Sequence, residues 1–96
     1  MFMNDWVFKR RGPLSWRVID GLAVALDESE GKVFHFDSVG TAIWSLLDGE
    51  TSVNETIRAL AEKFDAPESK IRKDALKFIK ELDRQDLIER VAHAGR

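Results

Sequence analysis

The sequence predicts an α+β domain in which three antiparallel strands are followed by three helices. Two observations predict it: apolar residues alternate with a period of two through residues 15–36, and the period becomes helical directly afterwards. The size agrees, because 96 residues with 44% apolar content fit one compact core and leave no room for a second.

The strand signals are three short aliphatic and aromatic runs at residues 16–19, 22–26 and 32–36. The dipeptide Asp20-Gly21 separates the first two, and Asp-Gly favours two-residue hairpins because both central positions take positive φ. In the third run, alternation places Phe34 and Phe36 on one face and Val33 and His35 on the other.

Each expected helix has its own start and stop signals. Asp37 or Ser38 can cap the first, which Asp48-Gly49 ends. Ser52 and Glu55 form a capping box for the second, and Pro67 suits the first position of the third. The third helix should stop near Asp86, and its apolar stripe contains Ile71, Ala75, Phe78, Ile79 and Leu82.

The two ends of the chain carry weaker signals than its centre. Residues 1–14, with Trp6, Phe8 and a basic triplet at 9–11, are expected to form an arm or short edge segment that covers the sheet, with docking of a partner as the alternative. The domain itself is expected at residues 15–90. Residues 91–96, including His93, are expected to form a frayed tail, and Trp44 to anchor the core.

Composition argues against catalysis. The chain has no cysteine, which excludes disulfides, thiolate metal sites and cysteine nucleophiles. The two histidines are isolated, and there is no phosphate-binding loop. We therefore expect no enzymatic activity, no cofactor and no metal site. No apolar run approaches the length of about 18 residues that a membrane span needs, so a soluble cytoplasmic protein is expected.

The pattern from the third strand onward resembles the PqqD-like family of RiPP recognition elements, also described as peptide chaperones. The resemblance covers roughly residues 16–88 and departs from the family's usual glycine at Asp86, a residue type that tolerates the left-handed conformation. It implies a winged helix-turn-helix that binds the leader of a ribosomally made precursor peptide and presents it to a modifying enzyme, often a radical SAM enzyme. The residues that carry it are Val33-Phe34-His35-Phe36-Asp37, Gly40, Ile43-Trp44, Leu47-Asp48-Gly49, Leu60, Phe64, Ile71, Asp74, Phe78-Ile79, Leu82 and Leu87-Ile88.

The resemblance also implies where the leader binds: along the edge of the third strand, in a cleft against the third helix. On a helical wheel, Leu76 and Ile79 could form the wall of this cleft, with Arg72 available to an acidic leader residue. Leu76 could equally widen the core stripe. His35 is expected to be an exposed strand residue, with pH sensing or a contact to a peptide carboxylate as the alternative. The expected peptide-binding residues are Val33, Phe34, His35, Phe36, Arg72, Leu76, Ile79 and Asp83.

DNA binding by a winged-helix transcriptional regulator is the alternative function. A DNA reader needs a clearly basic surface, and the third helix has only one more basic than acidic residue between positions 68 and 86. The net charge of −2 also disfavours binding to nucleic acid. A homodimer stays open, because a strand edge that accepts a peptide can also accept a second copy.

Overall fold

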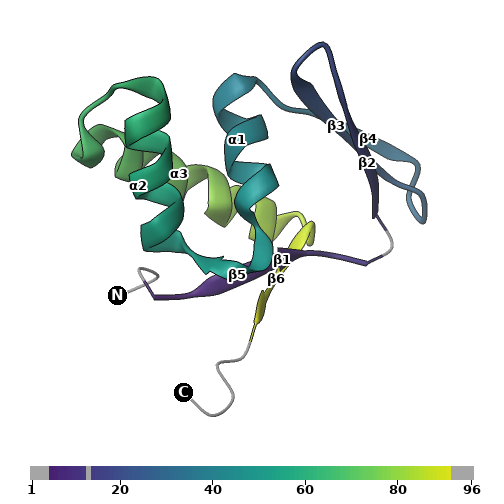
Figure 1. Ribbon diagram of the computed structural model, residues 1–96. Helices are drawn as coiled ribbons and strands as arrows, with labels where there is room; N and C mark the ends of the chain where they lie inside the picture. The colour runs from purple at the N-terminus through teal and green to yellow at the C-terminus, as the bar shows by residue number, and fades with distance from the viewer. Residues whose placement is uncertain (1–4, 13, 92–96) are drawn as a thin grey trace.

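The computed structural model describes residues 5–12 and 14–91, which form two three-stranded antiparallel sheets and three helices. One sheet stands on one side of α1, the helices α2 and α3 lie on the other side, and the second sheet runs below them (Figure 1). The elements are β1 (Val7–Arg10), β2 (Leu14–Ile19), β3 (Leu22–Asp27), β4 (Lys32–His35), α1 (Ser38–Leu46), β5 (Asp48–Ser52), α2 (Val53–Phe64), α3 (Glu68–Arg84) and β6 (Ile88–Val91).

The predicted meander is the sheet with strand order β2-β3-β4. Its first turn has φ of 53° at Asp20 and 81° at Gly21, which confirms the Asp-Gly hairpin. The strands extend by one or two residues beyond the predicted ends, except that β4 stops at His35. Phe36 still donates its N–H to the carbonyl of Ala23 at 3.0 Å, so the ladder continues to the start of α1.

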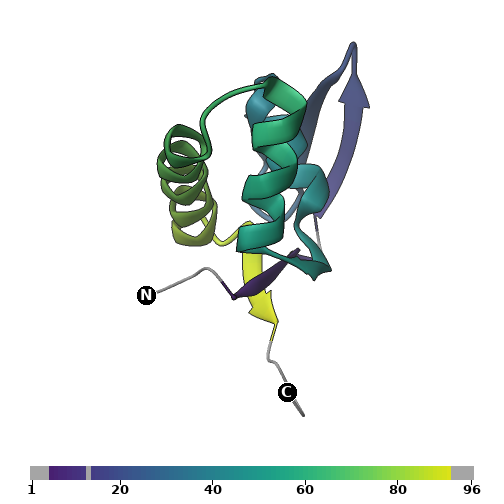
Figure 2. The ribbon, with the colours of Figure 1, turned by 60° about the vertical axis from the view of Figure 1, so that its left-hand side comes forward.

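The predicted helix caps are confirmed. Asp37 accepts from the N–H of Gly40 at 2.7 Å, and Ser52 and Glu55 form the reciprocal capping box of α2. Pro67 is the N-cap of α3, whereas the first position inside the helix was predicted for it. Asp86, with φ of 63°, takes the left-handed conformation that the turn after α3 requires. Figure 2 shows α2 and α3 packed side by side.

The second sheet, with strand order β5-β1-β6, was not predicted. The expectation of an N-terminal arm is wrong, because β1 is the central strand of this sheet and its Val7 and Phe8 are buried. After α3 the chain forms β6, which pairs with β1 from Val91 to Ile88. His93 lies outside the described residues.

A polar turn leads from α1 into β5. The carboxylate of Asp48 accepts hydrogen bonds from the N–H groups of Glu50 and Thr51 and from the Thr51 hydroxyl, at 2.8 to 3.0 Å. Burial by itself raises the pKa of Asp48, but these hydrogen bonds outweigh that effect and hold the pKa below its ordinary value of 3.8. The ionised form of Asp48 therefore stabilises the start of β5.

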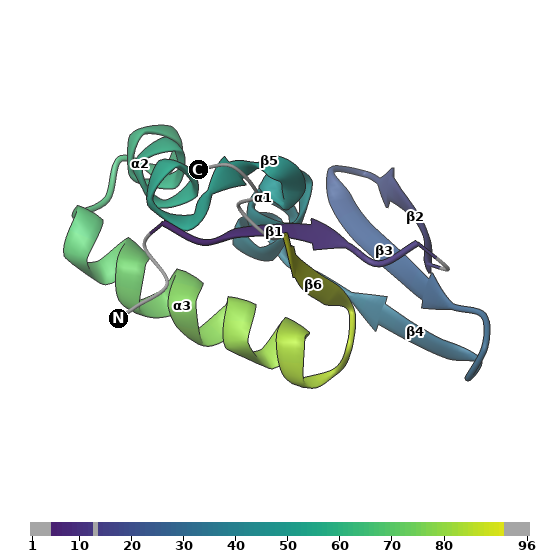
Figure 3. The ribbon, with the colours of Figure 1, turned by 90° about the horizontal axis from the view of Figure 1, so that it is seen from below.

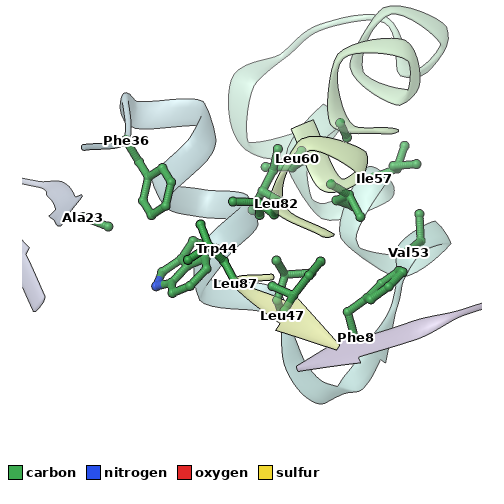
Figure 4. Close-up of a cluster of buried hydrophobic side chains, with 14 of the residues drawn as sticks. Phe8, Ala23, Phe36, Trp44, Leu47, Val53, Ile57, Leu60, Leu82 and Leu87 are labelled. Carbon is green, nitrogen blue, oxygen red and sulfur yellow. The ribbon is translucent and has the colours of Figure 1, made fainter. Parts of the chain in front are cut away.

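One hydrophobic core joins the helices to both sheets (Figure 4). Trp44 is fully buried in this core, as predicted. Phe8 closes the core from β1, and Ala23 and Ala25 bring β3 close to α1 because their side chains are small. The remaining buried members of the core are Phe36, Ile43, Leu47, Val53, Ile57, Leu60, Ile71, Ala75, Ile79, Leu82, Leu87 and Ile88.

Candidate functional site

The free edge of β4 is the first component of the candidate site. Within the described residues β4 pairs only with β3. Phe36 donates to Ala23, and an antiparallel ladder alternates between bonded and non-bonded pairs, so Val33 and His35 turn their N–H and C=O groups away from β3. These groups form a row of unpaired donors and acceptors, which is a template for another strand.

Aromatic side chains lie beside the end of this edge. Phe36 is buried, with its ring 5.1 Å from Trp44 and 5.6 Å from Phe78, which it meets edge-on. Phe78 comes from α3 and is half-buried. Gly40 permits this contact, because a Cβ there would lie 3.1 Å from the Phe78 ring. Figure 3 shows α3 and β4 along the same border of the molecule.

The helix flank expected from the wheel faces elsewhere. Arg72 donates to the side-chain oxygen of Asn54 on α2 at 2.8 Å and pairs with Glu68 at 3.1 Å. Ile79 is fully buried, so the expectation that it forms a wall of the cleft is wrong. Leu76 is half-buried against the core. Asp83 is exposed and shares the flank of Arg72, so this flank lies on the α2 side of the buried stripe.

The flank of α3 that contacts the end of β4 is the one that carries Phe78. Asp74 and Glu81 lie one turn before and one turn after Phe78 on this flank. Asp74 pairs with Lys70 at 3.3 Å. Hydrogen bonds from Arg84 and then from Gln85 hold the pKa of Glu81 below its ordinary value. An apolar ring is thus flanked by carboxylates whose charge is already paired within the helix.

Arg10 fixes the sheet that contains β4 to the rest of the molecule. Its guanidinium donates to the carbonyls of Trp44 at 2.7 Å and Ser45 at 3.3 Å, and lies 4.7 Å above the ring of Trp16 on β2. Burial lowers the pKa of Arg10, while the charge of Asp48 raises it. The hydroxyl of Thr41 on α1 accepts from the N–H of Ala23 at 2.8 Å. These contacts hold the β2-β3-β4 sheet against α1, so the free edge of β4 is already positioned before a ligand binds.

Sequence reasoning identified the strand edge but missed three residues that position it: Arg10, Thr41 and Phe78. Arg10 belongs to the basic triplet that was interpreted as part of an arm, and Phe78 was assigned to the core stripe. No periodic signal distinguishes them, because their roles depend on which elements meet in space. Among residues 5–12 and 14–91, no three His, Asp or Glu side chains gather as a metal site, and no helix is long and apolar enough to cross a membrane.

Two curated proteins are similar in sequence to part of this chain. A PqqA binding protein of Rhizobium meliloti (strain 1021) is 38% identical over 53 residues, which cover 55% of this chain and 54% of the relative. A PqqA binding protein of Gluconobacter oxydans (strain 621H) is 39% identical over 57 residues, 59% of each chain. The matches therefore span little more than half the length of these relatives.

A solved structure extends the likeness beyond the matched sequence. TbiB1 in complex with the TbiA(beta) leader peptide superposes with a TM-score of 0.78 at 27% identity, covering 84% of this chain and 94% of that one. The family described as coenzyme PQQ synthesis protein D (PqqD) matches residues 23–88, which include β3, β4 and all three helices. This chain belongs to the PqqD family.

Proposed function

We propose that this chain binds the leader region of a ribosomally synthesised precursor peptide and presents it to a modifying enzyme. The observation that carries the proposal is the row of unpaired backbone groups at Val33 and His35, next to the aromatic pair of Phe36 and Phe78. Two relatives are PqqA binding proteins, and the similar solved structure contains a leader peptide, which supports the proposal.

The leader binds as a fourth strand next to β4. The N–H groups of Val33 and His35 donate to its carbonyls, and their own carbonyls accept from its N–H groups. Backbone pairing supplies affinity for any extended segment, whereas selectivity comes from alternate leader side chains that point toward α3. Those side chains meet Phe34, Phe36 and Phe78, so they are apolar. Leu76 lies on the far flank of α3 and does not contact the leader.

Presentation, rather than chemistry, follows from the composition of the site. The described residues around β4 and Phe78 offer aromatic rings and backbone groups, with paired carboxylates nearby. The imidazole of His35 and these carboxylates are acid–base groups, but the described residues of the site offer no nucleophile–base pair suited to modifying a peptide. The chemistry therefore belongs to a second protein, for which a radical SAM enzyme is our first candidate.

No observation favours DNA binding, the alternative that the sequence left open. Three basic side chains on α3 are paired with acidic neighbours: Lys70 with Asp74, Arg72 with Glu68, and Arg84 with Glu81. A protein that binds DNA through α3 would need those charges for phosphates.

The test is a titration with the leader part of PqqA, the peptide that two relatives are named for binding. Isothermal calorimetry gives the affinity, and the amide shifts of the labelled chain give the site. We expect the amides of Val33 and His35 to shift together with the ring protons of Phe78. A leader of scrambled order and equal composition is the control and should bind weakly.

Two results would contradict the proposal. One is equal affinity for the native and the scrambled leader, which would mean that no extended pattern is recognised. The other is a set of shifts confined to the α2-facing flank at Arg72 and Asp83, with β4 unchanged. A band shift with a DNA duplex that survives physiological salt would instead favour the regulator.

A further inference from the structure

The β2-β3-β4 sheet has a second face, and the described part of the chain leaves it uncovered. In Figure 1, α1 covers one face of this sheet and no described element covers the other. The uncovered face carries aliphatic side chains: Ile19 is 52% exposed, Leu22 43% and Val33 53%. Val24 and Leu26 lie between them and are half-buried. Ile19, Val24, Leu26 and Val33 line a shallow hollow of about 400 Å³ together with Ser15, Trp16 and Arg17. We call this surface the outer face.

Arg17 brings a positive charge to the centre of the outer face. Arg17, Val24 and His35 form one row across the three strands, so a guanidinium and an imidazole flank the middle of the aliphatic surface. Arg17 is not seen to form an ion pair with another described residue. Glu28 accepts a hydrogen bond at 2.8 Å from the hydroxyl of Ser15, the residue before Arg17 on this face of β2. The outer face is thus apolar with a guanidinium near its centre, and it fits an apolar surface that carries a carboxylate.

A second copy of this chain, stacked on the outer face, would not bring a carboxylate to Arg17. A two-fold axis that stacks two outer faces about Val24 places Arg17 opposite either Arg17 or His35 of the other copy, because the row holds only these two ionisable groups. The aliphatic area is also small: a few side chains, already about half covered, expose on the order of a few hundred Å², against about 800 Å² per partner in a stable interface.

The position of the outer face indicates its partner. Val33 and His35 belong to the outer face through their side chains and to the peptide edge through their backbone groups. A leader strand added to β4 would widen this same face by one strand, and every second leader side chain would stand beside Val33 and His35. A protein docked on the outer face would therefore contact this chain and the bound leader together.

We propose that the outer face is the docking surface for the modifying enzyme, which contributes aliphatic side chains over Ile19 and Leu22 and a carboxylate to Arg17. This inference rests on the proposed function, because it needs a leader to be presented. It also explains presentation physically: the enzyme recognises a composite sheet in which the leader is the outermost strand. The enzyme then binds the loaded chain more tightly than the empty one.

The experiment uses a purified enzyme that modifies the peptide of the titration above. Its affinity for the labelled full chain is measured with and without saturating leader, and leader affinity is measured on the same samples. Ile19→Glu should weaken enzyme binding by about tenfold or more and leave leader affinity within about twofold. Val18→Glu is the matched control, because Val18 is equally exposed, at 50%, but its side chain lies on the opposite face of the same strand.

The charge is tested separately at Arg17. Arg17→Glu should weaken enzyme binding more than Arg17→Lys, because lysine keeps the positive charge. Equal loss in Ile19→Glu and Val18→Glu, or no loss in either, would overturn the inference while leaving leader binding intact. Failure of the wild-type chain to bind leader would instead overturn the proposed function. Sedimentation equilibrium of the chain alone should give a monomer; a dimer that Ile19→Glu dissociates would assign the face to a second copy and refute the inference.

Discussion

Replacing Val33 by proline would test strand addition by removing a single backbone N–H group. The N–H of Val33 faces the free edge of β4 and makes no bond to β3, so Val33→Pro removes a donor from the proposed peptide site and none from the fold. Proline is tolerated on edge strands where the missing N–H faces solvent. We therefore expect a folded protein with impaired leader binding.

The size of the effect follows from the number of bonds at this edge. Val33 and His35 offer two N–H and two C=O groups, and each bond formed there contributes about 0.5–1.5 kcal/mol net. The substitution removes one donor, and the ring obstructs the neighbouring bond on the leader. Loss of two such bonds amounts to about 1–3 kcal/mol, or about 5- to 150-fold in Kd.

The matched control is Val18→Pro on β2, the opposite edge of the same sheet. Ala23, which pairs with Val18, directs its N–H to Thr41 and its C=O to Phe36, so Val18 also turns its backbone groups to a free edge. Calorimetry with the leader should show a loss for Val33→Pro and none for Val18→Pro, after thermal unfolding has shown that both variants fold. Equal losses, or a larger loss for Val18→Pro, would refute strand addition at β4.

Four further predictions concern the groove and the fold. Phe78→Ala should weaken leader binding by about tenfold in calorimetry, and Leu76→Ala should leave it within about twofold; the reverse order would return the groove to the α2 side. Ser52→Ala removes the capping box and should lower the free energy of unfolding by about 1 kcal/mol in urea. Asp65→Gly should raise it by up to about 1 kcal/mol, because Asp65 ends α2 with φ of 50°; a decrease would refute this argument. The depressed pKa of Asp48 means that its stabilisation is fully present above pH 3.8 and is lost as the pH falls further, so Asp48→Asn should flatten the fall of the urea midpoint below that pH.

Local signals carried most of the prediction of the meander and the helices. Asp20-Gly21 determines its hairpin by backbone conformation alone, and the capping box at Ser52 needs only residues three apart. All the residues that make such an interaction are neighbours in the chain, so the interaction can be recognised from the sequence alone. The meander leaves β2 and β4 as edges, and the choice of the β4 edge as the peptide site came from the resemblance to the PqqD-like family.

The second sheet could not be predicted because none of its strands carries a signal of its own. β1 has only four residues. β5 has the sequence Asp-Gly-Glu-Thr-Ser, which is typical of a turn. Its register joins Val7 to Ser52 and to Val91, partners that lie more than forty residues away. A strand defined by such distant partners appears in a single sequence only as a short apolar segment, and Val7-Phe8 was therefore interpreted as part of an arm.

The misplaced helix flank has a different cause, which bears on how the groove can be tested. A helical wheel shows which residues share a flank, and it grouped Arg72, Leu76 and Asp83 correctly. It does not show which neighbour each flank faces, since that depends on how α3 crosses α1 and α2. The contact between Phe36 and Phe78 decides the orientation, because it ties one flank of α3 to the end of β4. Substitutions at Phe78 therefore test the proposed peptide groove, whereas those at Arg72 test the packing of α3 against α2.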